Sequence, residues 1–366
     1  MVQGGTVSAA DMVRQWQQAV KLNLLGTLHA HQAKALGLLS WTMALAGNCC
    51  AGAIASLAPA GEARPASVRR RMERLLANPR LNAVDAMLQM TGAILRNWGG
   101  RKLLLILDET PRQNALRCMR LSVAYHKRSL TLLSICYPTN HPPMPIPRLL
   151  RRMMRQVAGC LPQDATVTLL ADRGLCWPTV IRQCRRLKWH YLLRLQRDTR
   201  VRLDDGCEKA VWELAPDCGT RWFGQNVRIF KKARWLRANV AAVWEEQCRE
   251  PWLLVSDKHA SYACCRSYCK RTWCEESHRD EKSHGLNWQK SRVNDPDHAQ
   301  RLMLLISLAT LLCIATGANA IKRGVRRFFE PRWRRINSVF QLGRHCLQYA
   351  VTHEQLLIPL TSLPPP

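Results

Sequence analysis

Four chemically active side chains recur at helical spacing in the segment YCKRTWCEESHRDEK, residues 268–282. An α-helix turns by about 100° per residue, so positions three, four and seven apart share one face. An amphipathic helix normally reserves such a stripe for apolar residues. A phenol, a guanidinium, a carboxylate and an ammonium group on one face therefore predict a site that handles charged groups. These four residues are Tyr268, Arg271, Glu275 and Lys282.

Two further carboxylates follow runs of apolar residues that are typical of buried strands. Asp108 ends the run 103–107, and Asp172 ends the run ATVTLLA. Because strand ends meet at one rim of a sheet, we expect both to lie near Glu275, on the helix after the last core strand. Each acid alone has a common alternative, since an Asp after a strand is often a turn or cap residue and a helical Glu is often solvated.

Three carboxylates at one place predict a metal site. They repel one another, so such a cluster is costly without cations. Hard divalent ions prefer oxygen ligands, and Mg²⁺ combines a few carboxylates with substrate phosphate. Two such ions about 4 Å apart activate a water or hydroxyl group and stabilise the leaving oxygen in phosphoryl transfer. We therefore expect Asp108, Asp172 and Glu275 to bind Mg²⁺, for which Mn²⁺ can substitute.

Lysine and arginine outnumber the acidic residues by a wide margin. The 366 residues include 55 Lys and Arg against 26 Asp and Glu, which gives a net charge of +29. Such a surplus predicts a polyanionic partner, because Lys and Arg pair with phosphates and release counterions. A basic protein without a nucleic acid partner is the alternative, but the basic residues recur in clusters along the chain. At roughly 150 residues per domain, the length predicts two or three domains.

The sixteen cysteines do not predict a disulfide framework, because the chain is long and its start, MVQGGTVSAADMVRQWQQAV, has no apolar region typical of a signal peptide. We expect reduced thiols and a cytoplasmic protein. Five potential zinc ligands crowd together, but their spacing is not of the C-x2-C type and most would lie on one helix. A structural zinc site is therefore not predicted. These ligands are Cys264, Cys265, Cys269, Cys274 and His278.

Residues 302–321 are apolar over almost the length of a membrane span. The segment contains Ser, Thr, Gly and Asn and follows a long soluble pattern. A buried core helix is the favoured interpretation over a membrane span, and no contact with a membrane is expected.

The composition and the hydrophobic pattern of the sequence change along the chain and predict four parts. The first part is helical, the core alternates strands with helices, an insertion is rich in turns and tryptophans, and the last part is basic. We expect these parts at 1–97 (a helical DNA-binding domain), 98–196 with 251–320 (the core), 197–250 (the strand-rich insertion) and 321–366 (the basic segment).

Two basic segments have open interpretations. Residues 65–78 form a short predicted helix crowded with arginines, which is typical either of a recognition helix or of a solvated basic face. Residues 321–335 interleave seven basic residues with aromatics, which suits nucleic acid binding or, again, a solvated helix. The final LTSLPPP is predicted to be unstructured.

The order of strand with Asp, strand with Asp, strand-rich insertion and helix with Glu resembles the DDE transposases of bacterial insertion sequences. One subgroup has the signature Y-x2-R-x3-E-x6-K, which Tyr268, Arg271, Glu275 and Lys282 match at every spacing. The segments LDET and ADRG, with Asp108 and Asp172, are similar to those around the first two acids. The resemblance spans residues from about 100 to 320 and implies an α/β fold with a ribonuclease-H-like mixed sheet flanked by helices.

The resemblance also implies roles for individual residues. Asp108, Asp172 and Glu275 are expected to be catalytic metal ligands, and Tyr268, Arg271 and Lys282 to bind DNA phosphates. The segment WLLVS is similar to one whose tryptophan stacks on a flipped base, so Trp252 is either that residue or a tryptophan packed in the core. His278 lies on the same stripe but outside the signature, and we expect it to take no part.

This family resemblance implies a cut-and-paste reaction on double-stranded DNA with terminal inverted repeats. The expected product of the first step is a free 3′-hydroxyl, which attacks the opposite strand to form a hairpin, before the ends join target DNA. A homodimer is expected, because two ends must be cut and joined together. Two alternatives stay open: a related two-metal nuclease without strand transfer, and an inactive remnant that binds transposon ends as a repressor.

Overall fold

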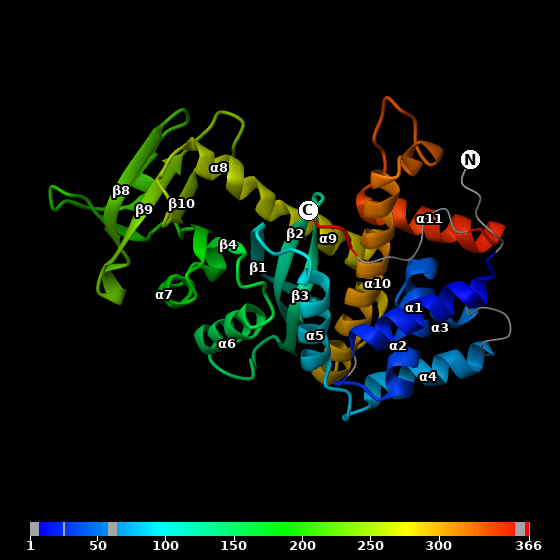
Figure 1. Ribbon diagram of the computed structural model, residues 1–366. Coiled ribbons are helices and arrows are strands. Elements are labelled where there is room, and N and C mark those ends of the chain that lie inside the picture. Colours follow the sequence, from blue (N-terminus) through cyan, green and yellow to red (C-terminus); the bar gives the residue numbers. More distant parts are fainter. Residues whose placement is uncertain (1–6, 25, 58–63, 356–362, 366) are drawn as a thin grey trace.

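The computed structural model describes residues 7–24, 26–57, 64–355 and 363–365. Helices gather at one end of the molecule, a mixed sheet occupies the middle, and the strands of the insertion lie at the other end (Figure 1). The predicted mixed α/β fold, with a sheet flanked by helices and a helical N-terminal region, is confirmed.

Ten strands form one sheet, in the order β3-β2-β1-β4-β5-β10-β9-β8-β6-β7. The pairs β1–β4 and β4–β5 are parallel and the other pairs are antiparallel. The strands of the insertion extend this sheet beyond β10 and do not form a separate layer. The strands are β1 (Lys102–Arg112), β2 (Leu116–Tyr125), β3 (Arg128–Pro138), β4 (Thr166–Ala171), β5 (His190–Arg194), β6 (Arg200–Arg202), β7 (Glu208–Ala210), β8 (Arg221–Ile229), β9 (Leu236–Val243) and β10 (Trp252–Ser256).

Apolar residues alternate between the two faces of the sheet, because successive side chains of a strand point to opposite sides. Leu105 and Leu107 belong to the larger core, which includes the helices α5 to α7, whereas Ile106 faces α8 and α9. Both faces of the central strands are thereby buried, which explains why their sequences are continuous apolar runs. The covering helices are α5 (Ala83–Leu95), α6 (Ile146–Ala158), α7 (Pro178–Arg186), α8 (Tyr262–Tyr268) and α9 (Thr272–Arg279).

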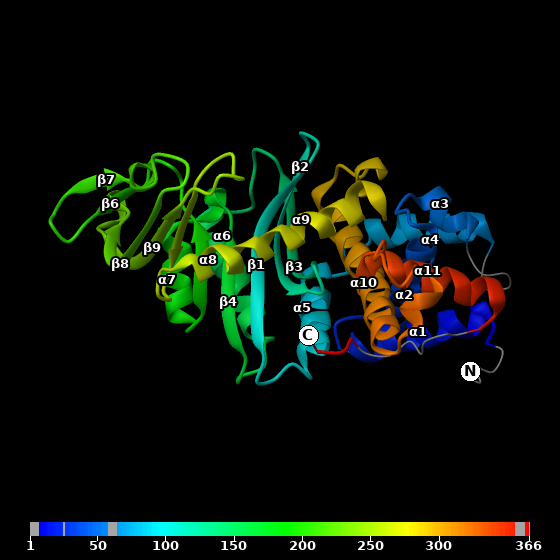
Figure 2. The same ribbon diagram turned by 90° about the horizontal axis from the view of Figure 1, so that it is seen from above.

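The helix predicted around residues 268–282 crosses the sheet, but it is not a uniform α-helix. A 3₁₀ turn at Cys269–Arg271 joins α8 to α9, and a π-helical turn at Asp280–His284 follows α9. Helix α8 packs against β5, β9 and β10, and α9 packs against β1, β2 and β3, so the pair runs over the middle of the sheet (Figure 2). The helical face that contains Arg271 and Glu275 thereby lies over the end of β4.

The remaining helices form a bundle at one end of the sheet. Helix α10 packs against α2, α4, α5, α11 and β3. Where α10 and α11 cross, a Cβ on Gly317 would lie 1.9 Å from the Val339 carbonyl oxygen, so the close approach requires glycine. The bundle helices are α1 (Ala9–Asn23), α2 (Ala30–Ala46), α3 (Ala51–Ser56), α4 (Pro65–Ala77), α10 (Pro296–Lys322) and α11 (Val339–His353).

Helix α10 contains the apolar segment 302–321. By length and composition it is the one described helix that is able to cross a membrane, but 83% of its most apolar window is buried inside the protein. This burial is typical of a core helix in a soluble protein, in agreement with the interpretation from the sequence.

The end of the chain differs in part from the predicted unstructured tail. Residues 356–362 and 366 lie outside the described part. Within 363–365, Leu363 is buried, and the Tyr125 hydroxyl donates a hydrogen bond to the Pro364 carbonyl oxygen at 2.9 Å. An apolar side chain and one backbone acceptor thus attach these residues to the protein surface, an interaction that a short proline-rich sequence does not reveal.

Candidate active site

The register of β1 and β4 places the first two acids side by side. Leu107 pairs with Ala171 at the end of the parallel ladder, so Asp108 and Asp172 are the next residue on each strand. We expected Asp108 at the end of its strand, but β1 continues to Arg112, and Asp108 pairs with Arg120 of β2. Asp108 therefore lies inside β1, at the point where its parallel neighbour ends.

One guanidinium group connects all three predicted acids. Arg271 Nη2 lies 3.0 Å from Asp108 Oδ1 and 3.5 Å from Asp172 Oδ2, and its Nη1 forms an ion pair with Glu275. Three adjacent carboxylates repel one another, and a cation among them relieves that repulsion. The structure thus brings Asp108, Asp172, Glu275 and Arg271 together, as the sequence predicted for the three acids.

These residues line an open cleft of about 460 Å³ above the sheet. Asp108 is buried at its floor, whereas the Glu275 side chain is 54% exposed at its rim. Lys282 also reaches the cleft, although it lies in the π-helical turn. The lining comprises Asp108, Glu109, Thr110, Asp172, Arg271, Glu275, His278, Arg279, Lys282, Ser283 and Gln289.

Tyr268 and Trp252 are placed apart from this cleft. The Tyr268 hydroxyl is buried and donates a hydrogen bond to the Ala171 carbonyl oxygen at 3.1 Å, which attaches α8 to the end of β4. The Trp252 ring meets the Tyr268 ring edge to face, with centroids 5.6 Å apart. Trp252 also lines a separate pocket of about 640 Å³ between α8 and the insertion. A phosphate contact for Tyr268 and base stacking for Trp252 both stay predictions.

The surroundings of the cleft raise the pKa of one of its groups and lower the pKa of two others. Burial raises the pKa of Asp108, and the nearby Arg271 guanidinium opposes this shift. Burial, assisted by the positive charge of Arg120, lowers the pKa of His278 and that of Lys282. The imidazole of His278 is therefore neutral at neutral pH, and the pKa of Asp108 is a balance between burial and the positive charges of Arg271 and, less strongly, Arg120.

A comparison with protein families supports the resemblance that was found in the sequence. Residues 102–312 match the family model described as the transposase DDE domain, which is more than half of the chain. The chain belongs to the DDE transposase family. The matched region runs from β1 into α10 and includes Asp108, Asp172 and Glu275. A comparison with curated proteins gives no match.

His278 lies next to Asp108 in the cleft of the transposase, although it stands outside the signature and we expected it to take no part. Its Nδ1 lies 3.4 Å from Asp108 Oδ2 and 3.1 Å from Thr110 Oγ1, and its ring is buried. His278 is one helical turn from Cys274, and the same turn faces β1. His278 follows Glu275 by three residues, and this helical spacing placed it on the same face as the acid. The signature Y-x2-R-x3-E-x6-K assigns no role to this position.

Two ion pairs that the sequence did not predict connect the turn after α9 to the sheet of the transposase. Arg120 of β2 forms an ion pair with Glu281, and both side chains are only 2% exposed. Arg128 Nε of β3 lies 2.5 Å from Asp280 Oδ2. Two acids in the π-helical turn are thus connected to two strands. The sequence feature that could have predicted a buried ion pair was the arginine in the middle of the apolar strand LRCMRLSVAY.

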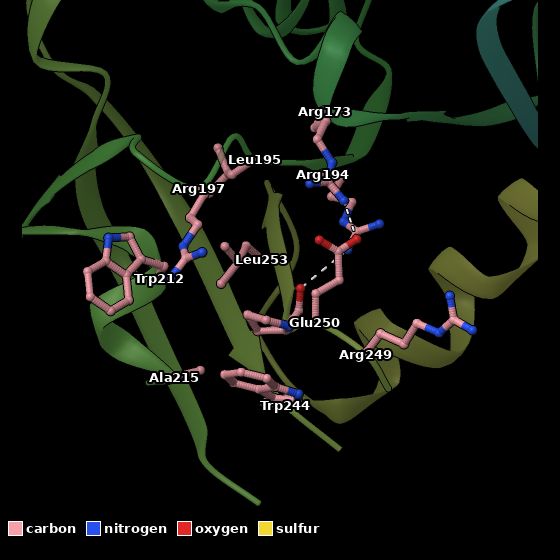
Figure 3. A pocket seen from close by; sticks show the side chains of 11 residues that line it. Arg173, Arg194, Leu195, Arg197, Trp212, Ala215, Trp244, Arg249, Glu250 and Leu253 are labelled. Atoms are coloured by element: carbon pink, nitrogen blue, oxygen red, sulfur yellow. Dashed lines mark hydrogen bonds and ion pairs between the residues drawn. The ribbon is translucent and has the colours of Figure 1, made fainter. Parts of the chain in front are cut away.

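A smaller pocket of the transposase, of about 120 Å³, is rich in arginine and lies between the core and the insertion (Figure 3). Glu250 forms ion pairs with Arg173 and, at 2.8 Å, with Arg194, while Arg197 stacks over Trp212 at 4.8 Å. Arg173 directly follows Asp172, so this pocket adjoins the candidate active site. A single carboxylate thus pairs with two of the four arginines that line this pocket, in the way that a phosphate can pair with arginine.

We expect Glu250→Gln to bind DNA about three- to tenfold more tightly, because the change frees two arginines for phosphates. The slope of log affinity against log salt should become steeper by about 1 to 2. Filter binding or fluorescence anisotropy over a range of salt concentrations measures both quantities. Glu213→Gln is the matched control, since Glu213 is exposed in the same insertion and forms no ion pair within the described residues. An unchanged salt slope in Glu250→Gln would contradict the prediction.

Proposed function

We propose that this transposase catalyses divalent-metal-dependent cleavage at the inverted-repeat ends of a bacterial insertion sequence and transfers the freed ends to target DNA. The reaction is cut-and-paste and proceeds through a hairpin. The observation that carries this proposal is the contact of one guanidinium with Asp108, Asp172 and Glu275 in an open cleft. The family membership supports a DNA-processing enzyme, and the charge of +29 supports a polyanionic substrate.

The three carboxylates fit Mg²⁺, with Mn²⁺ as a substitute. All three side chains offer only oxygen donors. Asp108 and Asp172 both lie within 3.5 Å of the Arg271 guanidinium, and the cleft is open to solvent. Hard divalent ions prefer this donor set. When bound, such ions activate the attacking hydroxyl and stabilise the leaving oxygen of phosphoryl transfer.

The other residues of the stripe hold the substrate and the helix in this proposal. Arg271 and Lys282 pair with phosphates next to the scissile bond, and Arg271 exchanges part of its contact with the acids for a phosphate. Tyr268 keeps α8 attached to β4 through the Ala171 carbonyl and reaches a phosphate only if that bond breaks. Trp252 stacks on a flipped base in its adjacent pocket.

The proposed assembly is a homodimer in the cytoplasm that holds two transposon ends together. Helix α4, with Arg69, Arg70, Arg71 and Arg74, contributes a basic surface at the bundle end of each protomer. A groove of about 350 Å³ between α2 and α4 is lined by three of these arginines. We expect this surface to contact DNA phosphates away from the cleavage site.

The decisive experiment uses a supercoiled donor plasmid that carries the ends of the element. The proposal expects cleavage with Mg²⁺ or Mn²⁺, a hairpin intermediate on denaturing gels, and joining of pre-cut ends to target DNA. A nuclease would cut without joining, which would refute the strand-transfer step. Binding to the ends that is equal in Ca²⁺ and Mg²⁺, without any cleavage, would instead establish the inactive repressor.

The raised pKa of Asp108 predicts that metal binding weakens as the pH falls. A divalent ion needs the carboxylate, so its affinity is lost as the pH drops through the pKa of this group. Arg271→Gln removes the main cation that lowers this pKa, so the loss should begin at a higher pH than in the wild type. Mn²⁺ binding, measured by electron paramagnetic resonance between pH 5 and 8, follows the effect.

The control for this pH prediction is Arg279→Gln, because Arg279 lines the same cleft but pairs with Glu276 at 3.3 Å. Its profile should follow that of the wild type. Identical profiles for Arg271→Gln and Arg279→Gln would show that Arg271 does not set the pKa of Asp108.

A further inference from the structure

Asp108 has a second set of neighbours that are soft metal ligands. Cys274 and His278 lie four residues apart on α9, which places both on the face toward β1. One potential ligand atom from each of Asp108, Cys274 and His278 lies within 4.8 Å of the other two. All three residues are buried, and Cys274 is only 1% exposed. Strand β1 and helix α9 thus hold a carboxylate, a thiol and an imidazole together.

The two oxygens of Asp108 face different partners. Oδ1 accepts a hydrogen bond from Arg271 at 3.0 Å, on the side of Asp172 and Glu275. Oδ2 lies 3.4 Å from His278 Nδ1. Asp108 therefore contacts the cation of the acid cluster through Oδ1 and the imidazole of the second cluster through Oδ2.

We propose that Asp108, Cys274 and His278 form a binding site for Zn²⁺ or a similar soft divalent ion, and that its occupation withdraws Asp108 from the catalytic set and inhibits cleavage. The binding part of this proposal stands on the cluster alone, and the inhibition rests on the proposed function. The sequence did not predict zinc here, because the ligand that completes the set comes from a strand about 165 residues away from the helix.

The chemistry of the ligands favours zinc over magnesium. Thiolate and imidazole bind Zn²⁺, whereas Mg²⁺ requires hard oxygen ligands in an octahedron. With zinc–ligand distances of about 2.0–2.3 Å, the ligand atoms of a tetrahedral ion lie about 3.5 Å apart, so the cluster must contract by about 1 Å. Three protein ligands leave the fourth position to water. The Cys274 thiol releases its proton to solvent on binding.

The charges around the cluster are compatible with a cation at this place. Arg120, Arg271 and Lys282 are the cations that face it, and Arg120 is already neutralised by Glu281. The Cys274 thiolate and the Asp108 carboxylate together balance the two charges of the ion. The Nδ1 of His278 becomes available to the ion once the Thr110 hydroxyl at 3.1 Å is displaced.

Cobalt absorption of the full-length protein tests the binding directly. Co²⁺ in a site with a thiolate gives a ligand-to-metal band in the near ultraviolet and visible bands typical of tetrahedral coordination. We expect one such Co²⁺ per chain, displaced by an equivalent of Zn²⁺, with at least about tenfold weaker binding in Cys274→Ser and in His278→Gln. Cys265→Ser is the matched control, since Cys265 is buried on the adjoining α8 outside the cluster.

The proposal is overturned if the Co²⁺ absorption bands persist in Cys274→Ser, or if Cys265→Ser removes them to the same extent. It is also overturned if the wild type shows no such bands. The second variant, His278→Gln, keeps the test decisive if Cys274→Ser fails to fold. In the cleavage assay with Mg²⁺, half-inhibition of Cys274→Ser should need at least about ten times more Zn²⁺ than that of the wild type. Equal inhibition overturns the regulatory part. If the protein never cleaves DNA, the proposed function fails while the cobalt spectrum still decides the site.

Discussion

Glu275→Gln is expected to reduce cleavage of the donor plasmid by at least about 10³-fold, because in the proposed function it removes one metal-ligating carboxylate and with it several kcal/mol of transition-state stabilisation. The substitution keeps the shape of the side chain and its position at the rim of the cleft. Binding to the DNA ends should stay within about threefold of the wild type, since phosphates are bound by the basic residues. Gel assays of cleavage and of binding measure the two quantities separately.

The adjacent residue provides a close control for Glu275. Glu276 carries the same carboxylate on the same helix, but it forms ion pairs with Arg128 at 3.9 Å and with Arg279 at 3.3 Å, outside the acid cluster. Glu276→Gln should therefore cleave at a rate within a few-fold of the wild type. Asp108→Asn should behave like Glu275→Gln. Comparable losses in both glutamate variants would show that the helix, and not the Glu275 carboxylate, is what the substitution disturbs.

The largest effect on stability is expected for Glu281→Gln. This substitution leaves the Arg120 guanidinium buried without its counter-charge, and both side chains are only 2% exposed. Removal of one partner from a buried ion pair costs about 3–5 kcal/mol of the free energy of unfolding. The Arg120 side chain also lies over the Trp288 ring at 5.4 Å, so it cannot swing out to water without loss of packing. The midpoint of urea unfolding measures the effect.

Two comparisons separate the buried charge from other causes. The double variant Arg120→Met with Glu281→Leu should recover most of the loss, because a buried apolar pair replaces a buried ionic pair at little or no cost. Glu245→Gln breaks the pair with Arg221, whose side chain is 56% exposed, and should change stability by less than about 1 kcal/mol. A loss in the double variant as large as in Glu281→Gln would mean that specific polar contacts, and not an unpaired charge, are responsible.

Local patterns were enough to predict the elements of this protein and the identity of its acids. The run 103–107 predicts a buried strand because apolar residues on both faces require cover on both sides. The spacing of Arg271 and Glu275 places them on one helical face because the helix has a fixed period. Segment 302–321 predicts a core helix from its polar interruptions, and α10 confirms it. These features depend on a few consecutive residues, which is why they are readable from the chain.

Only the tertiary structure decided which side chains meet. The register of β1 with β4 makes Asp108 and Asp172 neighbours, and the crossing of the helix over the sheet brings Arg271 to both. The same crossing places His278 beside Asp108 and pairs Glu281 with Arg120 in the core. The contacts of Arg271 and His278 with Asp108 and of Glu281 with Arg120 join residues more than 150 positions apart. Arg271 and Asp172 are 99 positions apart. Strand register and helix placement are set by packing over the whole molecule, so no local period of the sequence predicts them.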